Sequence, residues 1–268
     1  MESKVGILYI CTGRYWIFWE DFFKSCEKYF LPGIEKEYFV FTDAKKIFKE
    51  KNANVHKIYQ QKLKFPGDTL MRFDMFLRER SQLEKMEYLF FFNANLMFMQ
   101  NITPEDFFPG DDENGLIGYL HFAFYDKNPE EFLYERNPIS TAYIEPGKGK
   151  HYYQGCVIGG QTSSFIKMAE VLNQRIKKDL EKDFIAVWWD ESHLNYYLLD
   201  KKVKILHPGY CFPEVGFNDL PFEKKAIARN KSQRGGVNYL RGQDNSVISK
   251  LKFYIKRVLF HKKFSGSA

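Results

Sequence analysis

The sequence predicts an α/β fold in which helices cover both faces of a sheet. Five short apolar runs alternate with stretches of helical periodicity along a chain of 268 residues. This alternation is typical of βαβ units, and a chain of this length can form one α/β domain. The composition is 44% hydrophobic, 18% aromatic and 28% charged, which predicts a ring-rich core. It excludes a disordered chain, a collagen-like repeat and a disulfide scaffold.

The apolar runs and helical periods define the expected elements. Strands are predicted at residues 5–10, 38–42, 88–92, 116–120 and 203–206. Helices are predicted at residues 16–29, 69–85, 163–180 and 190–199. Ser163, Ser164 and Asp190 are candidate N-caps of the last two helices. Residues 107–146 are rich in Pro, Gly, Asn and aromatics, so we expect irregular structure there, of the kind that often carries function.

Cysteine usage and the lack of long apolar runs indicate the compartment. Cys11, Cys26, Cys156 and Cys211 have no metal-type spacing, so we expect reduced thiols, a cytosolic setting and no zinc site. No run of about 18 apolar residues is present to form a transmembrane helix. The run at residues 5–10 is too short for the core of a signal peptide.

Positive charge is concentrated near the C-terminus. Residues 221–268 hold 12 Lys and Arg and 2 acids, whereas the other 220 residues hold 28 and 32. This asymmetry argues against a nucleic-acid-binding protein. We place the main domain at residues 1–240 and a basic extension at 241–268, in which residues 247–263 have the period of an amphipathic helix. Such a helix either lies on an anionic membrane surface or docks on the core with a solvated basic face.

Most common enzyme motifs are absent from the sequence. The glycines of residues 155–160 match neither G-x-G-x-x-G nor a P-loop, which disfavours a Rossmann dinucleotide site. No Ser or Cys lies in a nucleophile elbow. The histidines form neither an H-E-x-x-H motif nor a metal-ligand cluster.

Two polar groups remain as candidate sites. Asn93 and Asn95 follow the predicted strand 88–92, and ligands of open α/β sheets bind at the carboxyl ends of strands. From residue chemistry alone, a turn that uses Asn to end the strand is the preferred interpretation.

The second group lies at the start of the predicted helix 190–199. It contains Trp188, Trp189, Asp190, Glu191 and His193. Trp rings stack on the apolar faces of sugars, and carboxylates bind hydroxyls or stabilise an oxocarbenium-like centre. The alternative is an N-capped helix whose tryptophans pack in the core.

This second group also carries a family resemblance. DESHLN at residues 190–195, followed by YLL at 197–199, resembles the DESHLNxYLL block of glycosyltransferase family 6. That family holds the histo-blood-group A and B transferases and the α-1,3-galactosyltransferases. Further matching blocks occur in the same order: YFVFTD (38–43), MRFDM (71–75), FLYERNP (132–138), AYI (142–144) and YYQG (152–155). The resemblance runs from about residue 5 to about residue 234.

The resemblance implies a single GT-A domain with a Rossmann-like nucleotide-binding mixed sheet. It implies transfer of galactose or N-acetylgalactosamine from a UDP-sugar, in α-1,3 linkage and with retention. The donor side is implied to hold Ile10, Tyr15, Asp43, Arg72, Gln154, Gly155, Cys156 and Asp190. Among these, Ile10 and Tyr15 are implied to contact uracil. Gln154 and Cys156 occupy the positions that choose between the two sugars.

The resemblance also assigns the acceptor side and the reaction centre. His121, Tyr134 and Trp188 are implied to line the acceptor site, with Glu191 beside them. Asp190 is implied to grip the donor sugar. Glu191 is the candidate nucleophile or the stabiliser of the cationic transition state, so a covalent and a front-face retaining mechanism both stay open.

One departure from the family pattern concerns metal. The metal-binding D-x-D is replaced by Asn93-Ala94-Asn95, and neutral amides bring only dipoles to Mn²⁺. We therefore expect a metal-independent transferase with both asparagines on the donor side, as in bacterial relatives whose motif reads N-x-N. The UDP leaving group then needs other positive charge. Lys231, with Arg229 and Arg234 beside it, is the candidate source, and a solvated tail is the alternative.

The expected partners are a UDP-sugar, with N-acetylgalactosamine preferred, and an oligosaccharide acceptor with a terminal β-galactoside, as in the α-1,2-fucosylated H antigen. We expect no cofactor, no nucleic acid and a cytoplasmic bacterial enzyme. Membrane contact through residues 247–263 is a hypothesis. A sugar-binding protein without catalysis is the second interpretation, supported by the lost D-x-D. An adaptor built around the basic tail is the third.

Overall fold

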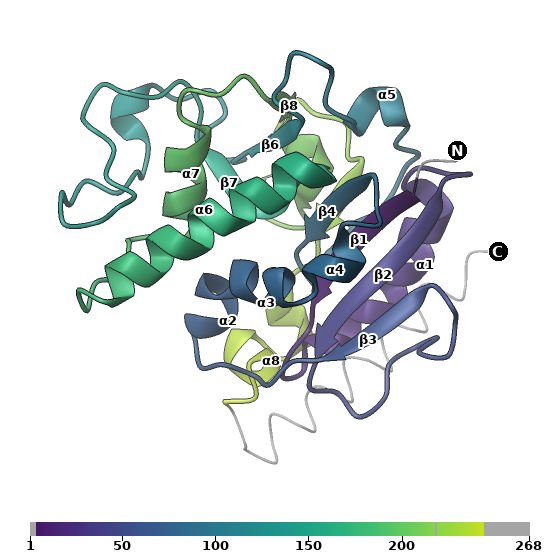
Figure 1. Cartoon of the computed structure of the whole chain (residues 1–268). Helices are drawn as coiled ribbons and strands as arrows, with labels where there is room; N and C mark the ends of the chain where they lie inside the picture. Colours follow the sequence, from purple (N-terminus) through teal and green to yellow (C-terminus); the bar gives the residue numbers. More distant parts are fainter. Residues whose placement is uncertain (1–3, 218, 244–268) are drawn as a thin grey trace.

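The computed structural model describes residues 4–217 and 219–243 and contains a central mixed sheet (Figure 1). Its seven strands lie in the order β3 (Val55–Tyr59), β2 (Glu35–Thr42), β1 (Lys4–Ile10), β4 (Tyr88–Phe92), β7 (Tyr153–Gln161), β6 (Leu116–Leu120) and β8 (Lys204–Leu206). The first four strands are parallel, β7 is antiparallel to β4 and β6, and β8 is parallel to β6. All five predicted strands are present.

Helices cover both faces of the sheet, as the alternating pattern predicts (Figure 1). On one face, α1 (Trp19–Tyr29) packs against Ile7 and Tyr9 of β1. On the other face, Leu8 of β1 joins a core cluster with the side chains of α3 (Arg72–Arg78), α6 (Thr162–Leu180) and α7 (Asp190–Leu198). Both faces are therefore apolar, which explains why the strands read as continuous hydrophobic runs.

A second, three-stranded sheet is not predicted from the sequence. It consists of β5 (Leu96–Phe98), β10 (Ala226–Ala228) and β9 (Phe212–Pro213). β10 runs antiparallel to β5 and parallel to β9. Two or three residues per strand give too short a pattern to recognise in the sequence. This sheet brings the segment after β10 next to the turn that follows β4.

Several expected boundaries differ in the structure. The predicted helix 69–85 is three short helices: α2 (Gly67–Leu70), α3 and α4 (Arg80–Leu83). The helix α6 begins at Thr162, so Gln161 occupies the N-cap position and the expected caps Ser163 and Ser164 are wrong. Residues 107–146 are mostly irregular, with β6 and a 3₁₀ turn at Pro129–Glu131 inside them.

Strand β7 was not expected because of its glycines. Glycine disfavours strand interiors by propensity, yet Gly159 lies in the middle of the sheet. A Cβ atom at Gly159 would lie 2.2 Å from Cδ1 of Phe90 and 2.4 Å from the carbonyl oxygen of Leu89. The large aromatic residue on β4 therefore requires glycine on its neighbour.

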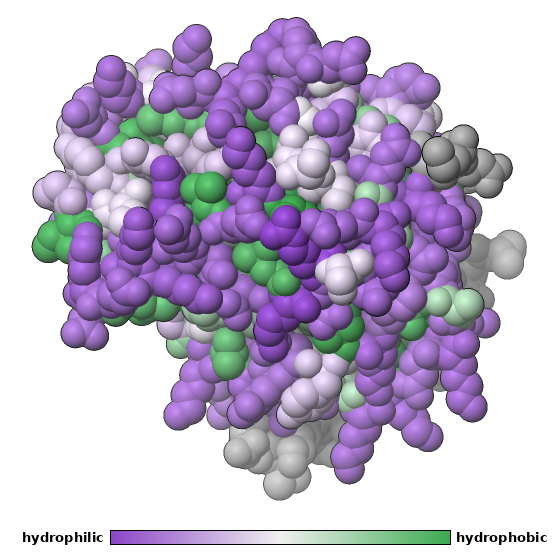
Figure 2. All heavy atoms as spheres, viewed as in Figure 1, coloured by the Kyte–Doolittle hydropathy of each residue, from purple (hydrophilic) through white to green (hydrophobic). Residues whose placement is uncertain are grey.

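The surface in the view of Figure 1 is mainly polar, with apolar atoms in separate groups (Figure 2). Within the described part of the chain, every helix is too short or too polar to span a bilayer. The four cysteines are unpaired and buried, as expected for reduced thiols. The predicted amphipathic helix at residues 247–263 lies outside the described residues.

Candidate active site

A cavity of about 270 Å³ lies at the carboxyl-terminal edge of the parallel strands. Ile10 ends β1 at this edge, and Asn93 and Asn95 follow β4. Because β7 is antiparallel to β4, it contributes its amino-terminal end, with Gly155, to the same edge. This is the edge at which open α/β sheets bind ligands.

The structure brings together most of the predicted site residues. The cavity is lined by Ile10, Tyr15, Arg72, Asn93, Asn95, Gln154, Gly155, Cys156, Trp188, Asp190, Glu191 and Lys231. These residues come from strand ends, helix starts and the C-terminal segment, which are far apart in the sequence. Convergence of polar groups of both charges in one concave site is typical of a ligand-binding site.

A strained turn places two carboxylates in the cavity. Trp189, before α7, has φ 55° and ψ −127°, a conformation that costs a non-glycine residue about 1–3 kcal/mol. The ring of Trp189 packs edge-on against Phe65, with centroids 4.5 Å apart, and Glu191 N–H donates to the carbonyl of Trp188 at 3.0 Å. Asp190 is thus the first helical residue, and the prediction that it is the N-cap is wrong.

Asp190 forms an ion pair with Arg72. Nε of Arg72 lies 2.7 Å from Oδ2 of Asp190, and Nη1 of Arg72 donates to the carbonyl of Gly155 at 2.5 Å. Both charged side chains are buried. Burial raises the pKa of Asp190 to about 6, and the guanidinium of Arg72 opposes that rise. The pair therefore forms a fixed, neutralised wall of the cavity.

Glu191, unlike Asp190, forms no ion pair with any cation of residues 4–217 and 219–243. Its Oε2 accepts a hydrogen bond from Gly155 N–H at 2.8 Å, and its Oε1 accepts one from the Tyr152 hydroxyl at 3.1 Å. Desolvation by the surrounding protein raises the pKa of Glu191 to about 7, the nearby Asp190 adds to the rise, and both hydrogen bonds oppose it. A carboxyl group with such a raised pKa in a cavity is typical of a functional site.

Three cations of the cavity have no ion-pair partner among residues 4–217 and 219–243: Lys62, Lys231 and Arg241. Nζ of Lys231 lies 5.5 Å from the ring centroid of Tyr15, and the Arg241 guanidinium lies 3.6 Å from that of Phe65. Desolvation lowers the pKa of Lys231, and the charge of Arg241 lowers it further. Cations that repel one another in a cleft attract an anionic ligand.

The asparagine pair ends strand β4, as the turn interpretation predicts, and its role toward a donor stays a prediction. Asn93 and Asn95 form the turn between β4 and β5, and both line the cavity. Nδ2 of Asn95 donates to the carbonyl of Arg229 at 2.8 Å, and Arg229 N–H donates to the carbonyl of Asn95 at 2.8 Å. Asn95 therefore joins this turn to the segment that carries Lys231.

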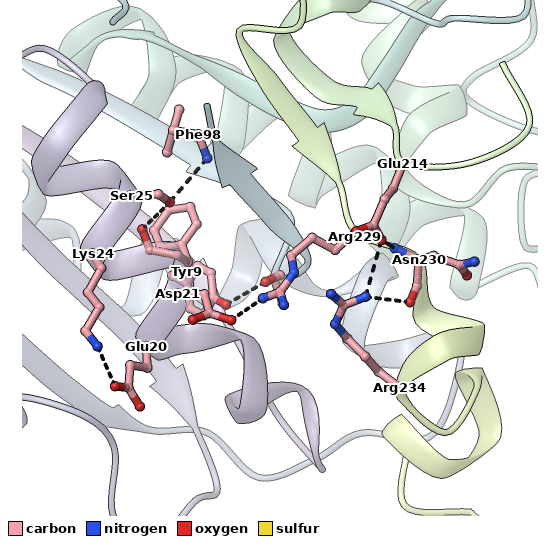
Figure 3. Close-up of polar contacts among 12 residues, drawn as sticks. Tyr9, Glu20, Asp21, Lys24, Ser25, Phe98, Glu214, Arg229, Asn230 and Arg234 are labelled. Atoms are coloured by element: carbon pink, nitrogen blue, oxygen red, sulfur yellow. Dashed lines mark hydrogen bonds and ion pairs between the residues drawn. The ribbon is translucent and has the colours of Figure 1, made fainter. Parts of the chain in front are cut away.

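Arg229, Arg234 and Asp43 do not line the cavity. Nη1 of Arg229 lies 2.5 Å from Oδ2 of Asp21, and Nη1 of Arg234 lies 3.3 Å from Oε2 of Glu214 (Figure 3). Both arginines thus form ion pairs. Asp43 accepts a hydrogen bond from Gly13 N–H at 2.8 Å and so shapes the loop after β1.

His121 and Tyr134 are not among the residues that line this cavity. They belong to an aromatic cluster, which we define as His121, Phe124, Phe132, Tyr134 and Tyr152. The ring of Tyr134 stacks on that of Tyr152, and its hydroxyl donates to the carbonyl of His151 at 2.6 Å. Burial lowers the pKa of His121 to about 4, so its imidazole is neutral at pH 7.

A second cavity of about 200 Å³ adjoins the first. The two cavities share the wall residues Asn93, Asn95, Gln154, Cys156 and Lys231. The second cavity is also lined by residues of the loops after β6 and β9, among them Phe122, Glu214 and Val215. The positions implied to choose the donor sugar thus lie between two spaces.

Several cavity residues were missed in the sequence: Thr12, Lys62, Phe65, Asp68, Thr69, Phe91 and Arg241. A Pro-Gly signal at residues 66–67 marks a loop, but nothing in the sequence shows which cavity that loop enters. Arg241 falls in the segment assigned to the tail. It is brought to the cavity because α8 (Val237–Leu240) docks on Arg14, whose N–H donates to the carbonyl of Leu240 at 2.8 Å.

Comparison with known proteins shows which family the chain resembles. A family model described as "Glycosyltransferase family 6" matches residues 1–234. The O-antigen biosynthesis glycosyltransferase WbnI of Escherichia coli is 38% identical over 230 residues, which cover 85% of this chain and 95% of that protein. Histo-blood group ABO system transferase 1 of Rattus norvegicus is 29% identical over 244 residues, 87% of this chain and 68% of that protein.

Globoside alpha-1,3-N-acetylgalactosaminyltransferase 1 of Gallus gallus is 28% identical over 223 residues, 80% of this chain and 63% of that protein. The mixed sheet between two helical layers confirms the expected GT-A fold. The match covers every motif block on which the resemblance rests. The chain belongs to glycosyltransferase family 6.

Proposed function

We propose that this glycosyltransferase moves N-acetylgalactosamine, or else galactose, from a UDP-sugar to the 3-OH of a terminal β-galactoside, in α-1,3 linkage and with retention. The observation that carries the proposal is the presence in one cavity of a desolvated carboxylate, Glu191, and two cations, Lys231 and Arg241, that have no ion-pair partner in the described part of the chain. Glycosyl transfer develops positive charge at the anomeric carbon and negative charge on the leaving diphosphate. The cavity offers the opposite charge for each.

The diphosphate is stabilised in this proposal without a metal ion. Lys62, Lys231 and Arg241 supply charge where the family's carboxylate pair is replaced by asparagines. Asn93 and Asn95 carry no charge, and the nearby carboxylate of Asp190 is paired with Arg72. This supports cationic side chains as the source of positive charge at the leaving group.

The donor sugar and the acceptor are assigned to the adjoining cavities. Gln154 and Cys156 lie in the wall that the two cavities share, where the donor sugar must meet the acceptor. The small side chain of Cys156 and the polar one of Gln154 favour an acetamido group, hence N-acetylgalactosamine. Trp188, 37% exposed at the rim, offers a ring face to an acceptor such as an α-1,2-fucosylated galactoside.

Glu191 acts at the anomeric carbon, either as the nucleophile or as the fixed charge beside the cationic transition state. Asp190 accepts hydrogen bonds from donor-sugar hydroxyls in this proposal, since its carboxylate is buried at the cavity wall and oriented by Arg72. Trp189 holds both carboxylates through the strained turn. These roles divide substrate grip and charge stabilisation between neighbouring residues.

The test is release of UDP from UDP-N-acetylgalactosamine and UDP-galactose in EDTA, with and without 2′-fucosyllactose. Acceptor-dependent release is the expected result, faster with the first donor. Release that requires added Mn²⁺ would contradict metal independence but not transfer. Binding of UDP by calorimetry without turnover under either condition, across a panel of β-galactoside acceptors, would favour the non-catalytic sugar-binding protein.

We also infer a cytoplasmic enzyme. The support is that all four cysteines are free and buried, which suits a reducing compartment. Contact with an anionic membrane would depend on residues 247–263, outside the described part of the chain, and stays a prediction. The expected loss of binding to anionic liposomes in a chain ending at residue 243 tests it.

A further inference from the structure

We propose that Tyr152 is a positioning residue for Glu191. The hydroxyl of Tyr152 fixes the carboxylate of Glu191 and favours its charged form. No motif of the sequence assigns this side chain a role. The proposal rests on the function proposed above, in which Glu191 acts at the reaction centre.

Among the described residues, the carboxylate of Glu191 is held by two neutral donors. Tyr152 O–H donates to Oε1 at 3.1 Å and Gly155 N–H to Oε2 at 2.8 Å, so each oxygen has one hydrogen bond. Asp190, by contrast, has the Arg72 guanidinium 2.7 Å away. Neutral donors orient a carboxylate without cancelling its charge. Glu191 therefore keeps its charge for a cationic centre in the cavity.

The ring of Tyr152 is locked, so its hydroxyl has little freedom to follow Glu191. The side chain is 2% exposed. Its ring centroid lies 5.0 Å from that of Phe124, 5.6 Å from Tyr134 and 5.7 Å from His121. Burial, with the nearby Glu191 anion, raises the pKa of Tyr152 far above its usual range. The hydroxyl thus keeps its proton and remains a donor throughout the working pH range.

In this proposal the aromatic cluster holds the ring of Tyr152 in place. His121 and Tyr134 do not line either cavity, yet both pack on Tyr152. In this proposal they influence the reaction centre indirectly, by orienting the hydroxyl of Tyr152. A displacement of this cluster would move the carboxylate of Glu191, and small displacements of catalytic groups are costly.

The other groups that act on Glu191 are accounted for. They are Asp190 on α7, Arg72 on α3, Tyr119 on β6 and Cys156 on β7. Asp190 raises the pKa of Glu191 and Arg72 lowers it. Burial raises the pKa values of Tyr119 and Cys156 well above their usual range, so both stay neutral. Loss of the Tyr152 hydroxyl therefore removes one neutral hydrogen bond from Glu191 without changing any charge around it.

The experiment titrates the Glu191 carboxyl directly. Protein labelled with ¹³C at the glutamate carboxyl carbon is followed by NMR from pH 5 to pH 9, and Glu191→Gln assigns the signal. Tyr152→Phe should raise the apparent pKa of Glu191 by about one pH unit, the typical value of a hydrogen bond to a charged group. Tyr153→Phe is the matched control. It removes the same atom one residue away, from a ring that packs in the core cluster with α6 and α7.

Activity supplies a second readout. The kcat of Tyr152→Phe should fall about fivefold at pH 7, where fewer molecules hold an ionised Glu191, and recover at pH 9. A loss that is equal at every pH would indicate a purely structural role and overturn the proposal. An unchanged titration of Glu191 in Tyr152→Phe would overturn it as well.

Replacement of Tyr152 by 3-fluorotyrosine keeps the ring and makes the hydroxyl a stronger donor. It should lower the apparent pKa of Glu191, and a rise or no change would contradict the proposal even if Tyr152→Phe does not fold. A wild-type protein without sugar transfer would refute the proposed function. The NMR titration would still decide whether Tyr152 controls Glu191.

Discussion

The acidic and basic walls of the cavity are built in opposite ways. Asp190 and Glu191 begin a nine-residue helix behind a strained turn, and their carboxylates are held by Arg72, Gly155 and Tyr152. The basic wall, defined as Lys62, Lys231 and Arg241, is half-buried and lies on loops and short turns. Its cations have no ion-pair partner in the described residues. Charge is preorganised on one wall and left available for a ligand on the other.

This difference indicates two tasks. A fixed carboxylate stabilises charge that develops only in the transition state, and fixed groups do so without reorganisation. Cations on loops can close over a diphosphate and release it as product, a step that sets the rate of many enzymes. We therefore expect substitution of Glu191 to affect chemistry and leave UDP binding intact, and substitutions on the basic wall to affect both chemistry and UDP binding.

The largest effect is expected from Glu191→Gln, which keeps the shape of the side chain and removes its charge. Transfer should fall by about 10³-fold or more, because the amide gives no negative charge at the anomeric carbon. UDP affinity, measured by calorimetry, should stay near that of the wild type. Glu170→Gln, at an exposed glutamate paired with Arg80, is the control. Near-normal transfer by Glu191→Gln would remove Glu191 from the reaction centre.

Lys231→Ala should have the next largest effect. Removal of one preorganised charge typically lowers kcat by about 10²–10³-fold, and UDP binding should weaken as well because this cation faces the ligand. Lys202→Ala removes the same charge from an exposed lysine paired with Asp112 and should leave both quantities unchanged. A fall in kcat of less than about tenfold, with intact UDP binding, would show that the basic wall does not stabilise the leaving group.

The smallest effect concerns pH and has opposite signs for activity and stability. The pKa of Glu191 is about 7, so kcat/KM should fall about tenfold per pH unit below that value and level off above it. The unfolded chain ionises Glu near pH 4.3, so between about pH 4 and 7 the folded state binds more protons. Its free energy of unfolding should therefore decrease as pH rises through this window.

Urea unfolding at pH 5 and pH 7.5 measures this second effect, with Glu191→Gln as the comparison. The variant should show a weaker dependence of stability on pH, because one of the two desolvated carboxyls is gone. Equal slopes for wild type and variant would indicate that Glu191 is not desolvated in the folded protein. The pH dependences of activity and stability could then not both be explained by the raised pKa of Glu191.

The parallel half of the sheet is predictable because its strands are uninterrupted apolar runs. β7 is not, because Gly159 is required by the ring of Phe90 rather than by any local preference. The helix around Arg72 was predicted as one element, but it is broken into short helices around the cavity. In each case a tertiary contact overrides the local pattern, and such contacts have no period in the sequence.

The acidic wall is predictable because its residues are neighbours in the sequence. Trp188 to Glu191 are adjacent in the sequence, so their residue types indicate a site even before the fold is known. Lys62 and Arg241 are separated from them and from each other, and only docking of α8 brings Arg241 to the cavity. His121 and Tyr134 were assigned to the acceptor site from motif positions. In the structure both rings pack on Tyr152, a contact that residue position alone does not predict, and their role at the acceptor stays a prediction.

The small sheet has a consequence for the timing of assembly. Asn95 and Arg229 are joined across 134 positions of the chain, and β10 pairs with β5 beside them. Contacts of such long separation form late, because closing a long loop costs entropy before the contact is made. During synthesis the acidic wall and most of the large sheet emerge from the ribosome before Lys231 and Arg241. The complete charge arrangement therefore forms only after Arg241 has been synthesised.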